Sequence, residues 1–87
     1  MRPGDARTAA ILGGAMRGLG RTEMAQRTLS VALQGDPKQP RALYEMGKLK
    51  ASSGDKAGAA ESFRSLQAAD ASFARAHGID EQLARLK

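Results

Sequence analysis

The sequence contains no cysteine, which excludes disulfide bonds and thiolate metal sites as sources of stability. Its single histidine, His77, excludes a metal site built from several histidine ligands. Aromatic residues make up 3% of the chain, and this scarcity argues against a β-sandwich or β-barrel, because such folds are rich in aromatic and β-branched residues. The 87 residues suffice for one small domain, and their composition favours an all-α fold.

Long apolar runs are also absent. The longest one near the N-terminus, residues 9–16, is short, contains glycine and follows Asp5, so we expect neither a membrane-spanning helix nor a signal peptide. The formal net charge is +5 and the pI is about 10.3, yet the charges are dispersed and form no basic tail. This excess of positive charge permits attraction to nucleic acid, to an anionic membrane or to an acidic protein. We expect a soluble, cytoplasmic protein.

Apolar residues recur at helical spacing and are interrupted by glycine and proline. This pattern predicts an irregular arm over residues 1–5, ending with Asp5 as a helix cap, and then five helices. Gly20 and Gly54 are expected to end the first and third helices, and Asp55 to cap the fourth. The helices are expected over residues 6–19, 22–34, 41–52, 56–69, and from Asp70 or Ser72 to about residue 86.

Each helix is predicted to turn one apolar face toward a common core. Gly13, Gly14 and Gly18 allow two interpretations, because each costs roughly 1 kcal/mol relative to alanine inside a helix. Either the first helix packs closely against a neighbour, or it is weak and frays. The predicted inward residues are, helix by helix, Ala9, Leu12, Met16 and Leu19; Met24, Ala25, Thr28, Leu29, Ala32 and Leu33; Leu43, Met46, Gly47 and Leu49; Ala59, Ala60, Phe63 and Leu66; and Phe73, Ala76, Ile79, Leu83 and Leu86.

A shift of 34 residues aligns the chain with itself. The aligned residues are Gly13 with Gly47, Gly20 with Gly54, Ala25 with Ala59, Asp36 with Asp70, and Arg7 with Arg41 and Arg75. This indicates two copies of one helical hairpin, over residues 6–39 and 40–72, followed by a capping helix over residues 73–87.

The repeated positions carry a characteristic set of residues. The second copy has Leu43, Met46, Gly47, Gly54, Asp55, Ala59 and Phe63, and the first has Leu12, Gly13, Gly20, Ala25, Leu29, Asp36 and Pro37. In this order and spacing they resemble the tetratricopeptide repeat. The resemblance implies antiparallel helical hairpins stacked as a short right-handed α-solenoid with a C-terminal capping helix. The sequence departs from the family pattern at Met16 and Lys50, where tyrosine is usual, and at Ala71, where proline is usual.

No set of catalytic residues accompanies the repeat. His77 has no serine or cysteine motif near it, and the glycines between residues 13 and 20 lack the strand and the Gly-Lys-Ser/Thr sequence of a phosphate loop. Carboxylates such as Asp55 and Asp70 fall near helix starts, where acidic residues are stabilising. We therefore expect a non-enzymatic protein without metal or cofactor, whose function depends on a binding surface.

The resemblance implies that a partner lies in the concave groove lined by the first helix of each hairpin. We expect this groove to bind an acidic or extended peptide, with arginines pairing its carboxylates and Tyr44 as an amphipathic anchor. The alternative is that these arginines are merely solvated. Ile11 and Glu45 stand where the family's chaperone-tail clamp has asparagine, which argues against that ligand. The candidate groove residues are Arg7, Arg17, Arg41, Tyr44, Lys48 and Arg75.

A second hypothesis is that the first helix docks on a partner or on another copy of the chain. Solenoids need about three repeats, whereas this chain has about two and a half. No polar capping helix covers the outer face of its first helix, unless the chain is a piece of a longer array. Nucleic-acid binding would depend on charge alone, because aromatic residues that stack on bases are nearly absent. The candidate self-association residues are Ala9, Ile11, Leu12 and Met16.

Overall fold

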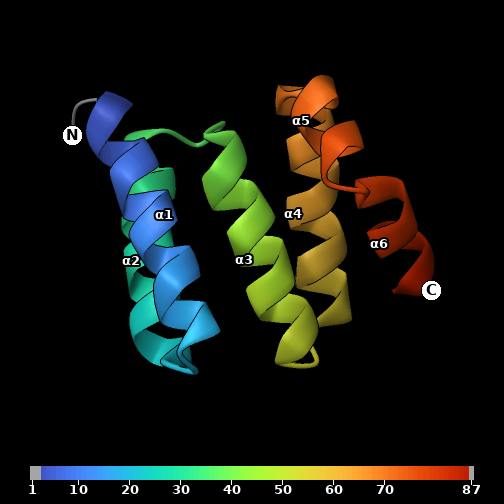
Figure 1. Cartoon of the computed structure of the whole chain (residues 1–87). Helices are drawn as coiled ribbons and strands as arrows, with labels where there is room; N and C mark the ends of the chain where they lie inside the picture. The colour runs from blue at the N-terminus through green and yellow to red at the C-terminus, as the bar shows by residue number, and fades with distance from the viewer. Residues whose placement is uncertain (1–2, 87) are drawn as a thin grey trace.

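Residues 3–86, which the computed structural model describes, fold into six α-helices joined by short turns (Figure 1). No strand occurs in this range, so the predicted all-α class is confirmed. The predicted bounds of the second, third and fourth helices are correct to within one residue. The helices are α1 (Pro3–Gly18), α2 (Thr22–Gly35), α3 (Pro40–Ser52), α4 (Lys56–Ala69), α5 (Ala71–Ala76) and α6 (Ile79–Arg85).

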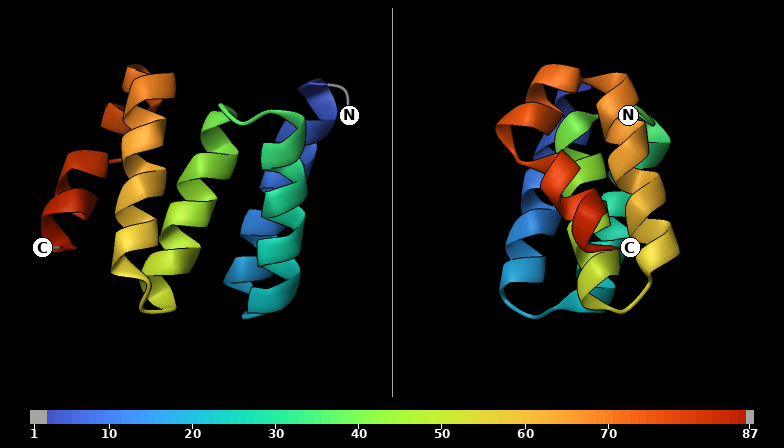
Figure 2. Two further views of the ribbon diagram at one scale, coloured as in Figure 1. Left: turned by 180° about the vertical axis from the view of Figure 1, so that it is seen from behind. Right: turned by 90° about the vertical axis from the view of Figure 1, so that its right-hand side faces the viewer.

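The helices lie in two layers. In Figure 1, α1, α3 and α5 face the viewer and α2 and α4 lie behind them, and the reverse view in Figure 2 shows α2 and α4 in front. Consecutive helices from α1 to α4 run in opposite directions, and α1 packs against both α2 and α3. Helices α5 and α6 pack on α4, so the α1–α2 hairpin forms one end of the described chain and α5 and α6 form the other.

Three glycines in the left-handed backbone region set the turns. Gly20 and Gly54 have φ values of 80° and 89° and follow α1 and α3, as predicted for helix-ending glycines. Gly78, with φ of 65°, breaks the predicted last helix into α5 and α6, so the prediction of one continuous helix there was wrong. Within α5, Ala74 is buried, whereas Ala76, which was predicted to face inward, is exposed.

Polar side chains cap three of the helix starts. The carboxylate of Asp55 accepts a hydrogen bond from the backbone N–H of Gly58 at 2.9 Å, and that of Asp70 accepts one from Phe73 at 3.0 Å. Gln39 caps α3 by accepting from the backbone N–H of Arg41 at 2.6 Å. These bonds satisfy donors that a helix start otherwise leaves without partners.

Helix α1 begins at Pro3, three residues earlier than predicted, and holds Asp5 in its first turn. Proline is compatible with this position because the first N–H groups of a helix have no intrahelical partner. Residues 1–2, the rest of the predicted arm, and residue 87 lie outside the described residues.

Close helix crossings involve equivalent glycines in the two hairpins. A Cβ atom at Gly13 would collide with the side chain of Leu29, and one at Gly47 would collide with the ring of Phe63. Both glycines are buried, and the two contacts are separated by the 34-residue period. At Gly13 the packing interpretation of the glycines is therefore confirmed, whereas Gly18 has no neighbouring atom within 4 Å of the position a Cβ would take.

The hydrophobic core extends through the layers of helices, and its largest fully buried side chains are Phe63, Leu29, Leu66 and Ile79. The predicted inward residues of α3 are buried, as are Ala59, Phe63 and Leu66 of α4, while Ala60 is half-buried.

The predicted inward face of α1 was wrong in part, because Ala9 and Met16 pack on the core but Leu12 and Leu19 do not. Leu12 and Leu19 are 50% and 75% exposed, while Ala6, Ala10 and Gly13 are buried. Small residues face α2 and α3 because only they allow the helix axes to approach closely, and the larger apolar residues are thereby turned outward. In α2, Met24 is also exposed, contrary to its predicted inward position.

Candidate binding groove

Two adjacent hollows lie between α1, the start of α3 and α5. Both are lined by Arg7, Arg41 and Phe73, and their volumes are about 250 and 260 Å³. Ile11 completes the lining of one, and Gln39 and Pro40 complete that of the other. We call this surface the Arg7–Arg41 groove. It combines two cationic side chains with apolar walls.

The two arginines of this groove carry charges that no carboxylate in residues 3–86 neutralises. Among the described residues, no carboxylate lies within 4.0 Å of the Arg7 or Arg41 guanidinium. The Nε atom of Arg41 is buried without a hydrogen-bond partner. Arg7 and Arg41 lie in the first two turns of α1 and α3, where the helix dipoles add positive potential. The groove therefore favours an anion.

An aromatic cluster lies next to the groove. The rings of Tyr44 and Phe73 meet edge to face with centroids 5.9 Å apart, and His77 stacks on Phe73 with centroids 4.0 Å apart. The Nδ1 atom of His77 is 2.9 Å from the backbone carbonyl oxygen of Phe73. Lys48 places its Nζ atom 3.4 Å from the Tyr44 hydroxyl and 5.3 Å from the centre of the ring. These contacts hold Phe73 and Tyr44 in position.

Arg17, predicted as a groove cation, is paired inside the protein. Its Nη2 atom lies 3.6 Å from a carboxylate oxygen of Glu45, which is only 4% exposed. The Glu45 side chain occupies the space beside Gly14 that any larger residue would fill. Arg17 is therefore neutralised, and the absence of a side chain at Gly14 leaves room for the buried Glu45 carboxylate.

Arg75 is not brought together with Arg7 and Arg41. It lines a separate hollow of about 190 Å³ with Gln67 and Asp80. The carboxylate of Asp80 there accepts a hydrogen bond from the Gln67 amide at 2.7 Å, which links α6 to α4. Of the predicted groove residues, Arg7 and Arg41 thus line the same hollows, while Tyr44 contacts Phe73 of the groove wall and Lys48 contacts Tyr44.

Two groove residues were missed by the sequence analysis. Phe73 was assigned only to the core, although it lines both hollows, and Ile11 was assigned only to self-association. The signal for Phe73 was its position two residues before Arg75, in the third helix start of the repeat. That signal alone did not distinguish a core residue from a groove wall.

The predicted self-association residues divide into two pairs. Ile11 and Leu12 are each about half exposed, whereas Ala9 and Met16 are half-buried and pack on core clusters. Met16 also accepts a hydrogen bond from the Thr28 hydroxyl at 3.4 Å. Other large apolar residues exposed on α1 and α2 are Leu19, Met24 and Val31.

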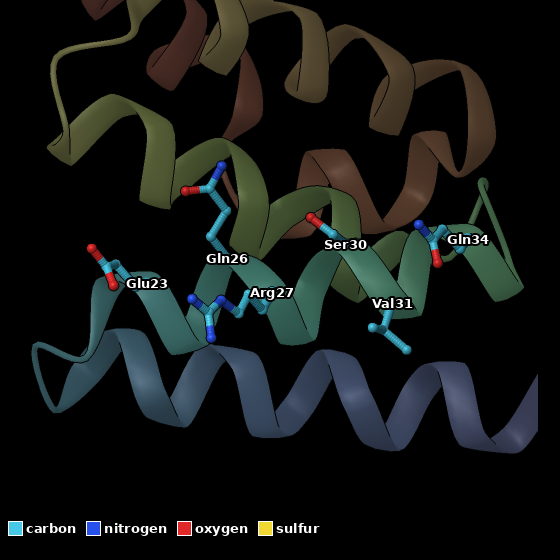
Figure 3. Close-up of a pocket in the computed structure, with 6 residues that line it drawn as sticks. All are labelled: Glu23, Gln26, Arg27, Ser30, Val31 and Gln34. Atoms are coloured by element: carbon cyan, nitrogen blue, oxygen red, sulfur yellow. The ribbon is translucent and has the colours of Figure 1, made fainter.

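A further hollow, of about 650 Å³, lies along α2 (Figure 3). Its lining comes from α2 alone, and Val31 points from it toward α1 whereas Ser30 and Gln34 point away from α1. This surface is formed by a single helix, whereas the Arg7–Arg41 groove has walls from α1, α3 and α5.

No group of three His, Asp or Glu side chains in the described residues is placed to hold a metal ion. No described helix combines the length and apolar character needed to cross a bilayer. No family model, no curated protein and no solved structure matches the chain. The functional argument therefore depends on the repeat and on the geometry of the groove.

Proposed function

We propose that the chain is a non-enzymatic protein-interaction module of tetratricopeptide type, which binds an acidic, extended peptide segment in the Arg7–Arg41 groove. The observation that carries the proposal is the pair of arginines that line the same hollows and have no carboxylate partner in the described part of the chain. In this proposal, residues 6–39 and 40–72 are two repeats of a short right-handed α-solenoid, and residues 73–87 cap its C-terminal end. The equivalent glycine crossings at Gly13 and Gly47 support that reading.

The chemistry of the groove favours a peptide over other ligands. Arginine forms paired hydrogen bonds with carboxylates, and Tyr44 offers an amphipathic ring to a neighbouring side chain. Lys48 adds a third cation one turn beyond Tyr44 on α3. No described cluster of titratable groups resembles a metal centre, and no candidate nucleophile lines the groove, so binding alone is the function that these residues support.

A charge-reversal experiment tests the proposal. The double variant Arg41→Glu, Lys48→Glu is expected to weaken binding of a fluorescein-labelled poly-aspartate/glycine octapeptide by at least about tenfold, because two attractive charges become repulsive. Anisotropy titrations at several salt concentrations measure this effect. The matched control, Lys56→Glu with Arg64→Glu on exposed positions of α4, makes the same change in net charge away from the groove. Equal losses in both variants would reject the groove as the binding surface.

A second candidate function, self-assembly or docking through the α1–α2 end, is favoured by one observation. The 34-residue shift aligns Ile11 and Leu12 with Glu45 and Met46. Glu45 and Met46 are buried where α3 meets the preceding hairpin, whereas Ile11 and Leu12 are exposed. The end of the chain formed by α1 and α2 thus presents the positions that a preceding hairpin would cover.

Light scattering over a concentration series tests the second candidate. Self-assembly through this end predicts a mass that rises with concentration, and a Leu12→Glu variant that stays monomeric because its charge cannot be buried at the contact. Glu61→Lys, on an exposed position of α4, is the control for a charge change elsewhere. A wild-type protein that is monomeric at every concentration contradicts self-assembly.

A further inference from the structure

We propose that the Arg7–Arg41 groove reads a composite signal, namely a side-chain carboxylate next to a bulky apolar side chain within a continuous peptide. This inference rests on the proposed peptide-binding function and specifies its ligand. The carboxylate pairs with Arg7 and Arg41, and the apolar side chain packs on Phe73 and Ile11.

The anionic half of the signal follows from which arginines are free. Three arginines lie on the α1 and α3 side of the molecule, and Glu45 neutralises one of them, Arg17. The side chains of Arg7 and Arg41 make no hydrogen bond or ion pair with the described residues, and both line the same two hollows. Two guanidinium groups that converge on one space favour a carboxylate, which can accept from both.

The apolar half follows from the walls of the groove. Phe73 is held by its stacking on His77 and by the edge contact with Tyr44, and it still lines both hollows. Ile11 is half exposed opposite it and lines the same hollow as both arginines. A side chain that covers these two residues removes apolar surface from water, which favours binding.

The size of the groove restricts the ligand. Each hollow is smaller than the roughly 300–1,000 Å³ usual for small-molecule sites, so each suits one or two side chains. Along α3, Arg41 precedes Tyr44 by one turn and Lys48 follows it by one turn. Because cations stand on both sides of the aromatic residues, the bound chain continues past them, which favours an internal carboxylate over a C-terminal one.

Four labelled probe peptides of glycine and serine test the inference by fluorescence anisotropy. Three have blocked ends and carry Asp-Phe, Asp-Ala or Asn-Phe at the centre, and the fourth has a free C-terminal phenylalanine and no aspartate. The Asp-Phe peptide is expected to bind about tenfold more tightly than each of the other three, because each lacks one part of the signal or presents it at the chain end.

Single-residue variants test which residues bind the carboxylate and which bind the apolar side chain. Arg7→Gln is expected to weaken Asp-Phe binding about fivefold and to leave Asn-Phe binding unchanged. Ile11→Asn is expected to reduce the difference in affinity between the Asp-Phe and Asp-Ala peptides, because the phenylalanine ring loses an apolar contact. Both positions are exposed, so these variants keep the fold, and Arg64→Gln on α4 serves as the control.

The outcomes separate the inference from the proposed function. If Asp-Phe and Asp-Ala bind equally and Arg41→Glu, Lys48→Glu abolishes both, the groove binds acidic peptides and the composite signal is rejected. Tighter binding of the free C-terminal phenylalanine also overturns the inference. If none of the acidic peptides binds, the proposed function and the inference fail together.

Discussion

Individual glycines decide how closely the helices of this chain approach one another. Gly13 and Gly47 occupy equivalent crossings, against Leu29 and Phe63, and neither site has room for a Cβ atom. Gly14 leaves space for the buried carboxylate of Glu45. The 34-residue period identified Gly13 and Gly47 as equivalent positions. It could not identify Glu45 as the contact of Gly14, because a helical pattern does not indicate which neighbour covers a given face.

Replacing Gly47 by alanine tests the role of the crossing. The added methyl group would press on the ring of Phe63, which is fully buried and cannot move outward. Gly47→Ala is expected to reduce the free energy of unfolding by about 1–2 kcal/mol, since overpacking outweighs the gain in helix propensity. Urea unfolding followed by circular dichroism measures the change.

Gly18→Ala is the matched control for this prediction. Gly18 lies at the end of α1 with no atom within 4 Å of the position a Cβ would take, so alanine should leave stability unchanged or raise it by up to about 1 kcal/mol. If Gly47→Ala and Gly18→Ala have the same free energy of unfolding, close packing against Phe63 is not the reason for a glycine at position 47.

At the scale of the helix, turn and cap signals were the reliable part of the sequence. The ends of α2, α3 and α4 follow from proline, glycine and aspartate alone. The cap at Asp55 was predicted, and Asp70 was one of two candidates, with Ser72, for the cap of the last helix. The inward face of α1 was predicted only in part, because hydrophobic periodicity assumes that large apolar residues point inward. In α1 close packing is achieved by alanine and glycine, and Leu12 and Leu19 are left exposed.

The cap of α5 supports the groove as well as the fold. The Asp70 carboxylate accepts a hydrogen bond from the backbone N–H of Phe73. Helix α5 has only six residues, so we expect the loss of this bond to weaken it. Asp70→Ala is expected to reduce the free energy of unfolding by about 1 kcal/mol and to weaken acidic-peptide binding, because Phe73 loses its fixed position. Thermal unfolding and anisotropy titration measure the two effects. Glu61→Ala, an exposed carboxylate on α4, is the control, and unchanged stability of Asp70→Ala would contradict the role of the cap.

For the whole molecule, the sequence was sufficient for the all-α class but not for the composition of the groove. Arg7 and Arg41 line the same two hollows, whereas Tyr44 and Lys48 line neither and contact each other next to Phe73. Arg17 and Arg75 do not join this groove, because Arg17 pairs with Glu45 and Arg75 lines a separate hollow with Gln67 and Asp80. Pairing of this kind depends on three-dimensional distances that a one-dimensional repeat does not contain.

The molecule has two surfaces that are candidates for contact with a partner, and they share Ile11. The Arg7–Arg41 groove is cationic and lies between α1, α3 and α5, whereas the α1–α2 end exposes Ile11 and Leu12 together with other apolar residues, among them Met24 and Val31 of α2. Met24 and Val31 line neither hollow of the groove, so one experiment can tell which surface a peptide uses.

That experiment is an NMR titration of the ¹⁵N-labelled protein with the amidated Asp-Phe peptide, followed through its backbone amide signals. Binding in the groove predicts the largest shift changes at Arg7, Ile11, Arg41, Tyr44 and Phe73, with little change at Met24 and Val31. Shift changes concentrated at Met24 and Val31, or none anywhere at millimolar peptide, would contradict the assignment of the groove as the binding site.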